Sequence, residues 1–147
     1  MTIDIIIDLL STFKPFDEND LENDNESYLD EIMTFVKSNK DYKKAFEPIF
    51  LLIEKYPNVD LGSPGPLVHT LEEYRGEYES FLIDSLKRRP TSLTAWMLNR
   101  IINVEENQLV KKGFIEFMAS LLKAENIDDK TRDKIENFVA FQRESLL

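Results

Sequence analysis

The stretch EYESFLIDSLKRRPTSLTAWMLNRIINV, residues 77–104, decides the fold class of this chain. Apolar residues recur every three or four positions on both sides of Pro90, which is the spacing of amphipathic helices. Pro90 ends the first helix, and Thr91 is placed to act as the N-cap of the second. The stretch therefore predicts two consecutive helices joined by a short turn.

The same helical spacing continues through the rest of the 147-residue chain. It recurs in TIDIIIDLLSTF, ESYLDEIMTFVKSN, DYKKAFEPIFLLIEKYP, PLVHTLEEYR, NQLVKKGFIEFMASLLKAE and DKTRDKIENFVAFQRESLL. Pro48 either kinks one helix or lies in the first turn of a second, and Asp128 is the expected N-cap of the last helix. No segment alternates polar and apolar residues long enough to indicate a half-buried strand. We expect one all-α domain over residues 1–147, with about seven to eight helices.

A weak internal similarity bears on how the helices are arranged. FLLIEKYP begins at Phe50, FLIDSLKRRP at Phe81 and FMASLLKAEN at Phe117, so the separations are 31 and 36 residues. Helix pairs of about this period are typical of α-solenoids. Amphipathic helices that end in basic residues also resemble one another by chance. Two architectures therefore remain open: a short HEAT-like stack of helical hairpins, and an irregular helical bundle.

Composition narrows the classes of function. The chain has no cysteine, which excludes disulfides and thiolate chemistry and suits a reducing cytoplasm. It has no apolar run near the ~20 residues of a membrane span, and no recognisable signal peptide. Its net charge is −10, of which −9 lies in residues 1–31. Because contacts to negatively charged phosphates dominate nucleic-acid affinity, this acidic charge predicts no nucleic-acid partner. The absence of a long apolar run predicts no membrane association, and together with the absence of cysteine it favours a cytoplasmic location.

The acidic excess is densest in DENDLENDNESYLDE, residues 17–31, which has eight acids in fifteen positions. One interpretation is a docking patch for a basic partner, with the candidate residues Asp17, Glu18, Asp20, Glu22 and Asp24. The alternative is a solvated loop that leads into a helix N-cap. The spacing from Asp20 partly matches an EF-hand, but Asn25 stands where that loop needs glycine. We predict no metal site and no cofactor.

The stretch LGSPGPLVHTLE, residues 61–72, holds two of the four glycines, two of the six prolines and the only histidine. It lacks the lysine and the preceding strand of a phosphate-binding loop, and its prolines remove N–H donors. We interpret it as the start of a helix, capped by Ser63 or Gly65, with Pro66 at the first helical position. His69 is either packed or hydrogen-bonded, with Glu73 four residues on, or it contacts a partner.

The segment TAWMLNRIIN contains a second set of candidates. Its apolar residues cover most of the helix circumference, as in a central buried helix, and Asn99 and Arg100 interrupt them. A buried Arg100 needs a carboxylate and a buried Asn99 needs hydrogen-bond partners. In the functional alternative Trp96, Asn99 and Arg100 line a groove, because Trp and Arg often anchor interfaces.

Residues 61–103, LGSPGPLVHTLE…YESFLIDSLKRRPTSLTAWMLNRIIN, resemble bacterial immunity proteins that act against secreted polymorphic toxins. The resemblance implies an α-helical cytoplasmic protein that binds and blocks a cognate toxin. The acidic charge of the chain favours a basic toxin domain as that protein partner. No recognisable catalytic signature occurs, so we expect a non-catalytic binding module. A general helical-repeat adaptor or scaffold is the alternative. A small enzyme would need a pocket around His69, Trp96, Asn99 and Arg100. The oligomeric state stays open.

Overall fold

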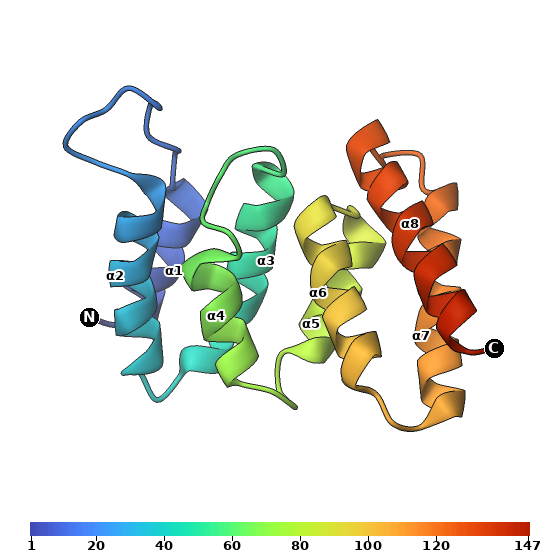
Figure 1. Ribbon diagram of the computed structural model, residues 1–147. Coiled ribbons are helices and arrows are strands. Elements are labelled where there is room, and N and C mark those ends of the chain that lie inside the picture. Colours follow the sequence, from blue (N-terminus) through green and yellow to red (C-terminus); the bar gives the residue numbers. More distant parts are fainter. The chain divides into compact units, whose positions relative to one another are not determined.

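The computed structural model describes residues 1–147 and contains eight α-helices, two 3-10 helices and no strand (Figure 1). The elements are α1 (Ile3–Thr12), α2 (Asn25–Lys37), η1 (Tyr42–Ala45), α3 (Phe46–Lys55), α4 (Gly65–Glu73), α5 (Glu79–Arg88), α6 (Ser92–Val104), α7 (Gln108–Ser120), η2 (Leu121–Lys123) and α8 (Asp129–Ser145). The all-α prediction is confirmed. None of these helices combines the length and the hydrophobicity that a membrane-crossing segment needs.

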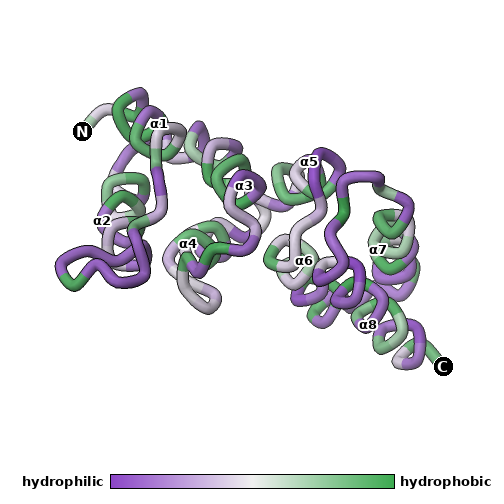
Figure 2. Tube along the Cα trace, turned by 90° about the horizontal axis from the view of Figure 1, so that it is seen from above, coloured by the Kyte–Doolittle hydropathy of each residue, from purple (hydrophilic) through white to green (hydrophobic).

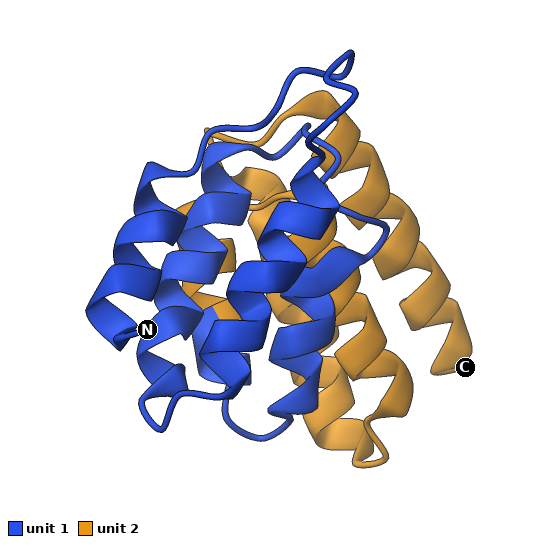
Figure 3. Ribbon diagram, turned by 90° about the vertical axis from the view of Figure 1, so that its left-hand side faces the viewer, with its two compact units in different colours: residues 1–81 blue, residues 82–147 orange.

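The helices form two compact units (Figure 3). Unit 1 is Met1–Phe81 and unit 2 is Leu82–Leu147, so the boundary falls within α5. The helix content is compatible with both a stack and a bundle, and the HEAT-like repeat and the single domain over 1–147 stay predictions.

Unit 1 is built from two principal helix pairings. α1 packs against α3 and η1, and α2 packs against α4 and α1. Most of the apolar stripe of each helix is buried, as the helical spacing predicted, and Ile7 of α1 is half-buried. The buried side chains include Ile6, Leu10, Leu29, Met33, Val36, Phe46, Ile49, Phe50, Leu67 and Leu71.

An aromatic cluster joins η1 to the turn that follows α4. The Tyr42 and Tyr74 rings stack with 4.2 Å between centroids, and Phe46 packs against both. The Tyr42 hydroxyl donates a 2.7 Å hydrogen bond to Glu77 Oε1, and this bond raises the pKa of Tyr42 above its ordinary value. Burial, followed by the charges of Glu73 and Glu77, raises the pKa of Tyr74. The cluster closes the end of unit 1 at which η1 meets α4.

In unit 2, α6 packs against both α7 and α8, which also pack against each other. Met97, Leu98 and Ile102 of α6 are buried, as are Ile115 and Met118 of α7 and Ile135 and Val139 of α8. The prediction of a central buried helix with apolar residues over most of its circumference is only partly correct, because Leu93, Trp96 and Ile101 keep part of their surface exposed.

Local capping signals set several of the helix starts. The Thr91 hydroxyl accepts a hydrogen bond from the Thr94 N–H at 3.1 Å, and the Thr91 N–H donates to Thr94 Oγ1 at 3.2 Å. This reciprocal pair is a capping box. Asp128 accepts from the Thr131 N–H at 2.7 Å. The predicted N-caps Thr91 and Asp128 are therefore confirmed. Pro48 is the third residue of α3, so it lies in the first turn of a helix that follows η1.

The start of α4 differs from the prediction. The helix begins at Gly65, Pro64 precedes it and no side chain caps it, so neither Ser63 nor Gly65 is the N-cap. Pro66 is the second helical residue, where its missing N–H is still tolerated. Gly62 and Gly65 have positive φ angles, and a Cβ on Gly62 would lie 2.3 Å from Gly65 Cα. Gly62 is required because the backbone passes very close to itself here, whereas Gly65 is favoured by its positive φ alone.

Candidate functional site

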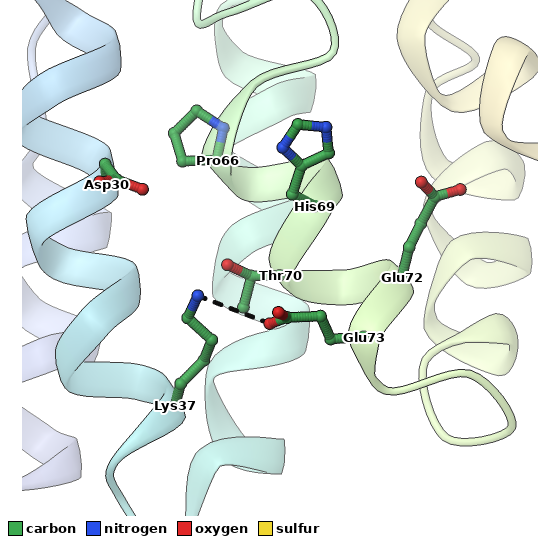
Figure 4. Close-up of a pocket in the computed structure, with 7 residues that line it drawn as sticks. All are labelled: Asp30, Lys37, Pro66, His69, Thr70, Glu72 and Glu73. Atoms are coloured by element: carbon green, nitrogen blue, oxygen red, sulfur yellow. Dashed lines mark ion pairs between the residues drawn. The ribbon is translucent and has the colours of Figure 1, made fainter.

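An open groove of about 500 Å³ lies between α2 and α4 of unit 1 (Figure 4). We call it the α2–α4 groove. Two of its seven lining residues come from α2 and five from α4. They are Asp30, Lys37, Pro66, His69, Thr70, Glu72 and Glu73. Three carboxylates and one ammonium therefore surround the groove.

The helical repeat explains why these side chains share a face. Asp30 and Lys37 are seven residues apart, which is close to two turns of α2. The neighbouring positions Leu29, Met33 and Val36 are buried, so the helix directs its polar residues away from the interior. In the same way, the burial of Leu67, Val68 and Leu71 leaves His69 and Glu73 of α4 exposed. The groove forms because α2 and α4 pack against each other along these buried stripes.

An ion pair spans the groove from one helix to the other. Lys37 Nζ lies 3.5 Å from Glu73 Oε2, and both side chains are partly exposed (Figure 4). His69 is exposed and forms no hydrogen bond with another side chain, so the packed or hydrogen-bonded His69 that we predicted is wrong. Glu73 pairs instead with a lysine 36 positions away. His69 is accessible on the rim of the groove, as a partner-contacting residue has to be.

The loop between α1 and α2, residues 13–24, is the acidic loop; it is hydrophilic over most of its length (Figure 2). Three of its candidate acids accept hydrogen bonds from nearby backbone N–H groups. Asp17 accepts from the Asn19 N–H at 2.8 Å, and Asp24 caps α2 by accepting from the Ser27 N–H at 2.8 Å. Asp20 accepts from the backbone N–H groups of Glu22 and Asn23, which lower the pKa of its carboxyl.

The other two candidate acids, Glu18 and Glu22, are exposed and their carboxylates make no hydrogen bond. The solvated loop that leads into an N-cap is therefore confirmed, whereas the docking patch for a basic partner stays a prediction. Hydrogen bonds to backbone N–H groups occupy the carboxylates of Asp17, Asp20 and Asp24, whereas those of Glu18 and Glu22 are exposed and make no such bond. No group of three or more histidine, aspartate or glutamate side chains is arranged to hold a metal ion.

Sequence reasoning missed Asn25, which connects the acidic loop to the segment before α4. Its Oδ1 accepts from the Phe16 N–H at 2.8 Å, and its Nδ2 donates to the Asp60 carbonyl at 3.3 Å. Both partners are backbone groups at distant positions, so no local spacing could have indicated them. Asn25 fixes both ends of the loop relative to the helices of unit 1.

The remaining candidates, Trp96, Asn99 and Arg100, lie on α6 in unit 2. Arg100 is exposed, and its guanidinium lies 4.8 Å from the centre of the Trp96 ring, a cation–π contact. The prediction of a buried Arg100 is therefore wrong. Asn99 is half-buried, and its Oδ1 accepts a 2.9 Å hydrogen bond from Gln142 Nε2 of α8. His69 belongs to unit 1, so a pocket formed by all four residues stays a prediction.

Gln142 is a second residue that sequence reasoning missed. It is 1% exposed, and its Nε2 donates to Asn99 Oδ1 and, at 2.6 Å, to Asn103 Oδ1. Asn99 and Asn103 are four residues apart, so one turn of α6 presents both oxygens to the same amide. This arrangement joins α6 to α8 and gives Asn99 a structural partner.

Comparisons with protein-family models, with curated proteins and with solved structures find no match to this chain.

Proposed function

We propose that this chain is a non-catalytic protein-binding module that captures a basic protein partner through unit 1. The observation that supports the proposal is the division of charge between the two units. Residues 1–81 carry eighteen acidic and seven basic side chains, a formal net charge of −11. Residues 82–147 carry ten acidic and eleven basic side chains, a net charge of +1. A field concentrated on one unit speeds the arrival of a cationic partner and orients it.

The acidic loop and the α2–α4 groove are the two surfaces of unit 1 with the strongest case for contact. The loop presents Glu18 and Glu22 with no internal partner, on a backbone that Asp17, Asp20 and Asn25 hold in place. A pre-formed loop loses little conformational entropy on binding, which favours affinity. The groove adds a concave surface against which a partner's side chain can pack.

In its finer form, the proposal is that the partner is a bacterial toxin domain and that this chain is its cytoplasmic immunity protein. The resemblance of residues 61–103 to such proteins supports this form, and the acidic unit suits an inhibitor of a basic enzyme. The general adaptor makes a different prediction, namely several unrelated partners.

The test is affinity purification of the tagged chain from its native host at low salt, followed by mass spectrometry. We expect one stoichiometric basic polypeptide that dissociates as the salt concentration rises. Several unrelated proteins would support the adaptor. An acidic or neutral partner that is insensitive to salt would refute the electrostatic mechanism.

Once the partner is identified, a double substitution that removes two charges tests the role of the acidic loop. Glu18→Gln with Glu22→Gln should slow association and flatten its salt dependence, because two charges that attract the cationic partner are removed. The fold should be retained, because neither carboxylate makes a hydrogen bond within the protein. Glu125→Gln with Glu136→Gln makes the same charge change in unit 2 and is the matched control. Equal association rates for the two variants would remove the acidic loop from the mechanism.

A further inference from the structure

The Thr70 side chain lines the α2–α4 groove, and its hydroxyl has no hydrogen-bond partner within the protein. The residue as a whole is 2% exposed. Figure 4 shows the hydroxyl on the side of α4 that faces α2. Every fully buried side-chain nitrogen and oxygen in the protein has a hydrogen-bond partner, so the small exposed part of Thr70 includes its hydroxyl oxygen, which is open to the groove. The Thr70 oxygen therefore offers a lone pair and a proton to whatever enters the groove.

The charges around Thr70 select the kind of group that enters. The Asp30 carboxylate takes part in no ion pair or hydrogen bond, and Figure 4 shows it across the groove from Thr70. Glu73 shares its charge with Lys37 at 3.5 Å, a distance that leaves room for a closer donor. Carboxylates and a hydroxyl oxygen are together the acceptors that an ammonium or guanidinium group requires.

The shape of the groove indicates that the cation arrives on a stem. The ring of Pro66 and the imidazole of His69 line the same opening, and they provide apolar surface beside the charged groups (Figure 4). Lysine and arginine bury their methylene chains against such surface while their charged ends reach polar partners. A volume of about 500 Å³ exceeds what one small ion needs and suits a long side chain.

We infer that the α2–α4 groove receives a lysine or arginine side chain of the protein partner, with the cation between Asp30 and Glu73 and a donor N–H on the Thr70 hydroxyl. This inference rests on the proposed function and adds to it the position and the chemistry of one contact. The incoming cation and Lys37 compete for the Glu73 carboxylate, and the 3.5 Å ion pair with Lys37 weakens when the partner's side chain enters.

The experiment is an amide NMR titration of the intact chain with capped Gly-Gly-Arg-Gly-Gly and Gly-Gly-Lys-Gly-Gly peptides. The matched control peptide has citrulline in place of arginine, which keeps the shape and removes the charge. We expect saturable shifts at Asp30, Lys37, His69 and Thr70 with the cationic peptides and none with citrulline. Shifts confined to the acidic loop, or equal shifts with citrulline, would overturn the inference. Methylguanidinium binding as tightly as the arginine peptide would also overturn it, because the stem would then contribute nothing.

Three variants identify the groups responsible. Thr70→Val keeps the shape and removes the hydroxyl, so it should weaken peptide binding about twofold to tenfold. Asp30→Asn alters an exposed residue, leaves the fold intact and should weaken binding at least as much. Glu125→Gln makes the same charge change at an exposed position of unit 2, outside the proposed binding surfaces, and should leave groove binding unchanged. Unchanged affinity in Asp30→Asn would refute the assignment whatever Thr70→Val does.

The inference and the proposed function fail in different experiments. If the purification yields no basic partner while the peptides still bind the groove, the proposed function fails and the groove chemistry stands. If a basic partner is captured and its affinity is unaffected by Asp30→Asn and Thr70→Val, the proposed function stands and the groove contact is refuted.

Discussion

Replacing Gly62 by alanine should destabilise unit 1 strongly, for a reason that can be worked out atom by atom. Gly62 has a φ of +116°, a conformation that costs a residue with a Cβ roughly 1–2 kcal/mol. The added Cβ would also lie 2.3 Å from Gly65 Cα, whereas Cβ atoms essentially never approach another atom within 3.0 Å. The obstructing atom is backbone, so it cannot rotate away, and the two segments must separate. Overpacking of this kind costs about 1–3 kcal/mol, which gives a total of roughly 2–5 kcal/mol.

Two other glycines serve as graded controls in the same chain. Gly76 has a φ of +95° and open space around an added Cβ, so Gly76→Ala should lose only the conformational part, about 1–2 kcal/mol. Gly113 lies inside α7, with nothing within 4 Å of an added Cβ, so Gly113→Ala should stabilise by about 1 kcal/mol. Urea unfolding followed by far-ultraviolet circular dichroism measures all three. The reasoning is refuted if Gly62→Ala costs no more than Gly76→Ala.

Three further predictions concern hydrogen bonds. Asp24→Ala removes the N-cap of α2 and should lower stability by about 1 kcal/mol in thermal unfolding, whereas Glu22→Ala should change it little. Gln142→Leu leaves two amide oxygens of α6 without their donor and should cost about 1–3 kcal/mol in urea unfolding; an unchanged midpoint contradicts the assigned bonds. The Glu77 hydrogen bond raises the pKa of Tyr42 in the folded protein above the unfolded value of about 10. The bond therefore stabilises the fold at pH values below about 10, and this stabilisation is lost as the pH rises through the pKa of folded Tyr42. Glu77→Gln should lower the pKa of Tyr42 in an ultraviolet absorbance titration, and an unshifted titration would contradict this cause.

Local signals in the sequence predicted the secondary structure well. Helical spacing gave the all-α class, and Thr91 and Asp128 were readable as N-caps because each acts on a backbone N–H three residues away. The start of α4 was misjudged because the deciding contact is the approach of Gly62 to Gly65, which the pattern of Gly and Pro does not specify. Spacing identifies where a chain turns more reliably than how closely its backbone passes itself.

The candidate site was predictable only in part, because its groups come together through tertiary packing. Lys37 and Glu73 are 36 positions apart, and nothing local in either segment indicates that α2 and α4 pack together. Glu73 was expected near His69 from helical spacing alone, whereas Lys37 of α2 takes that carboxylate. Thr70 carried no signal at all, since a threonine becomes informative only when packing places its hydroxyl at a groove without a partner in the protein. The acidic loop was recognised from its composition. Which of its acids accept backbone hydrogen bonds depends on the turns of the loop, which the composition does not specify.

The division of the chain into two units has an optical consequence. All five tyrosines, at positions 28, 42, 56, 74 and 78, belong to Met1–Phe81, and the single tryptophan, Trp96, belongs to Leu82–Leu147. Each unit therefore contains a chromophore that the other lacks, and no label is needed to observe them separately. Tyrosine absorbance follows the melting of the first unit, while tryptophan emission follows that of the second. Coincident curves would mean that the chain melts as one cooperative body, and separated curves would mean that each unit keeps its own melting temperature.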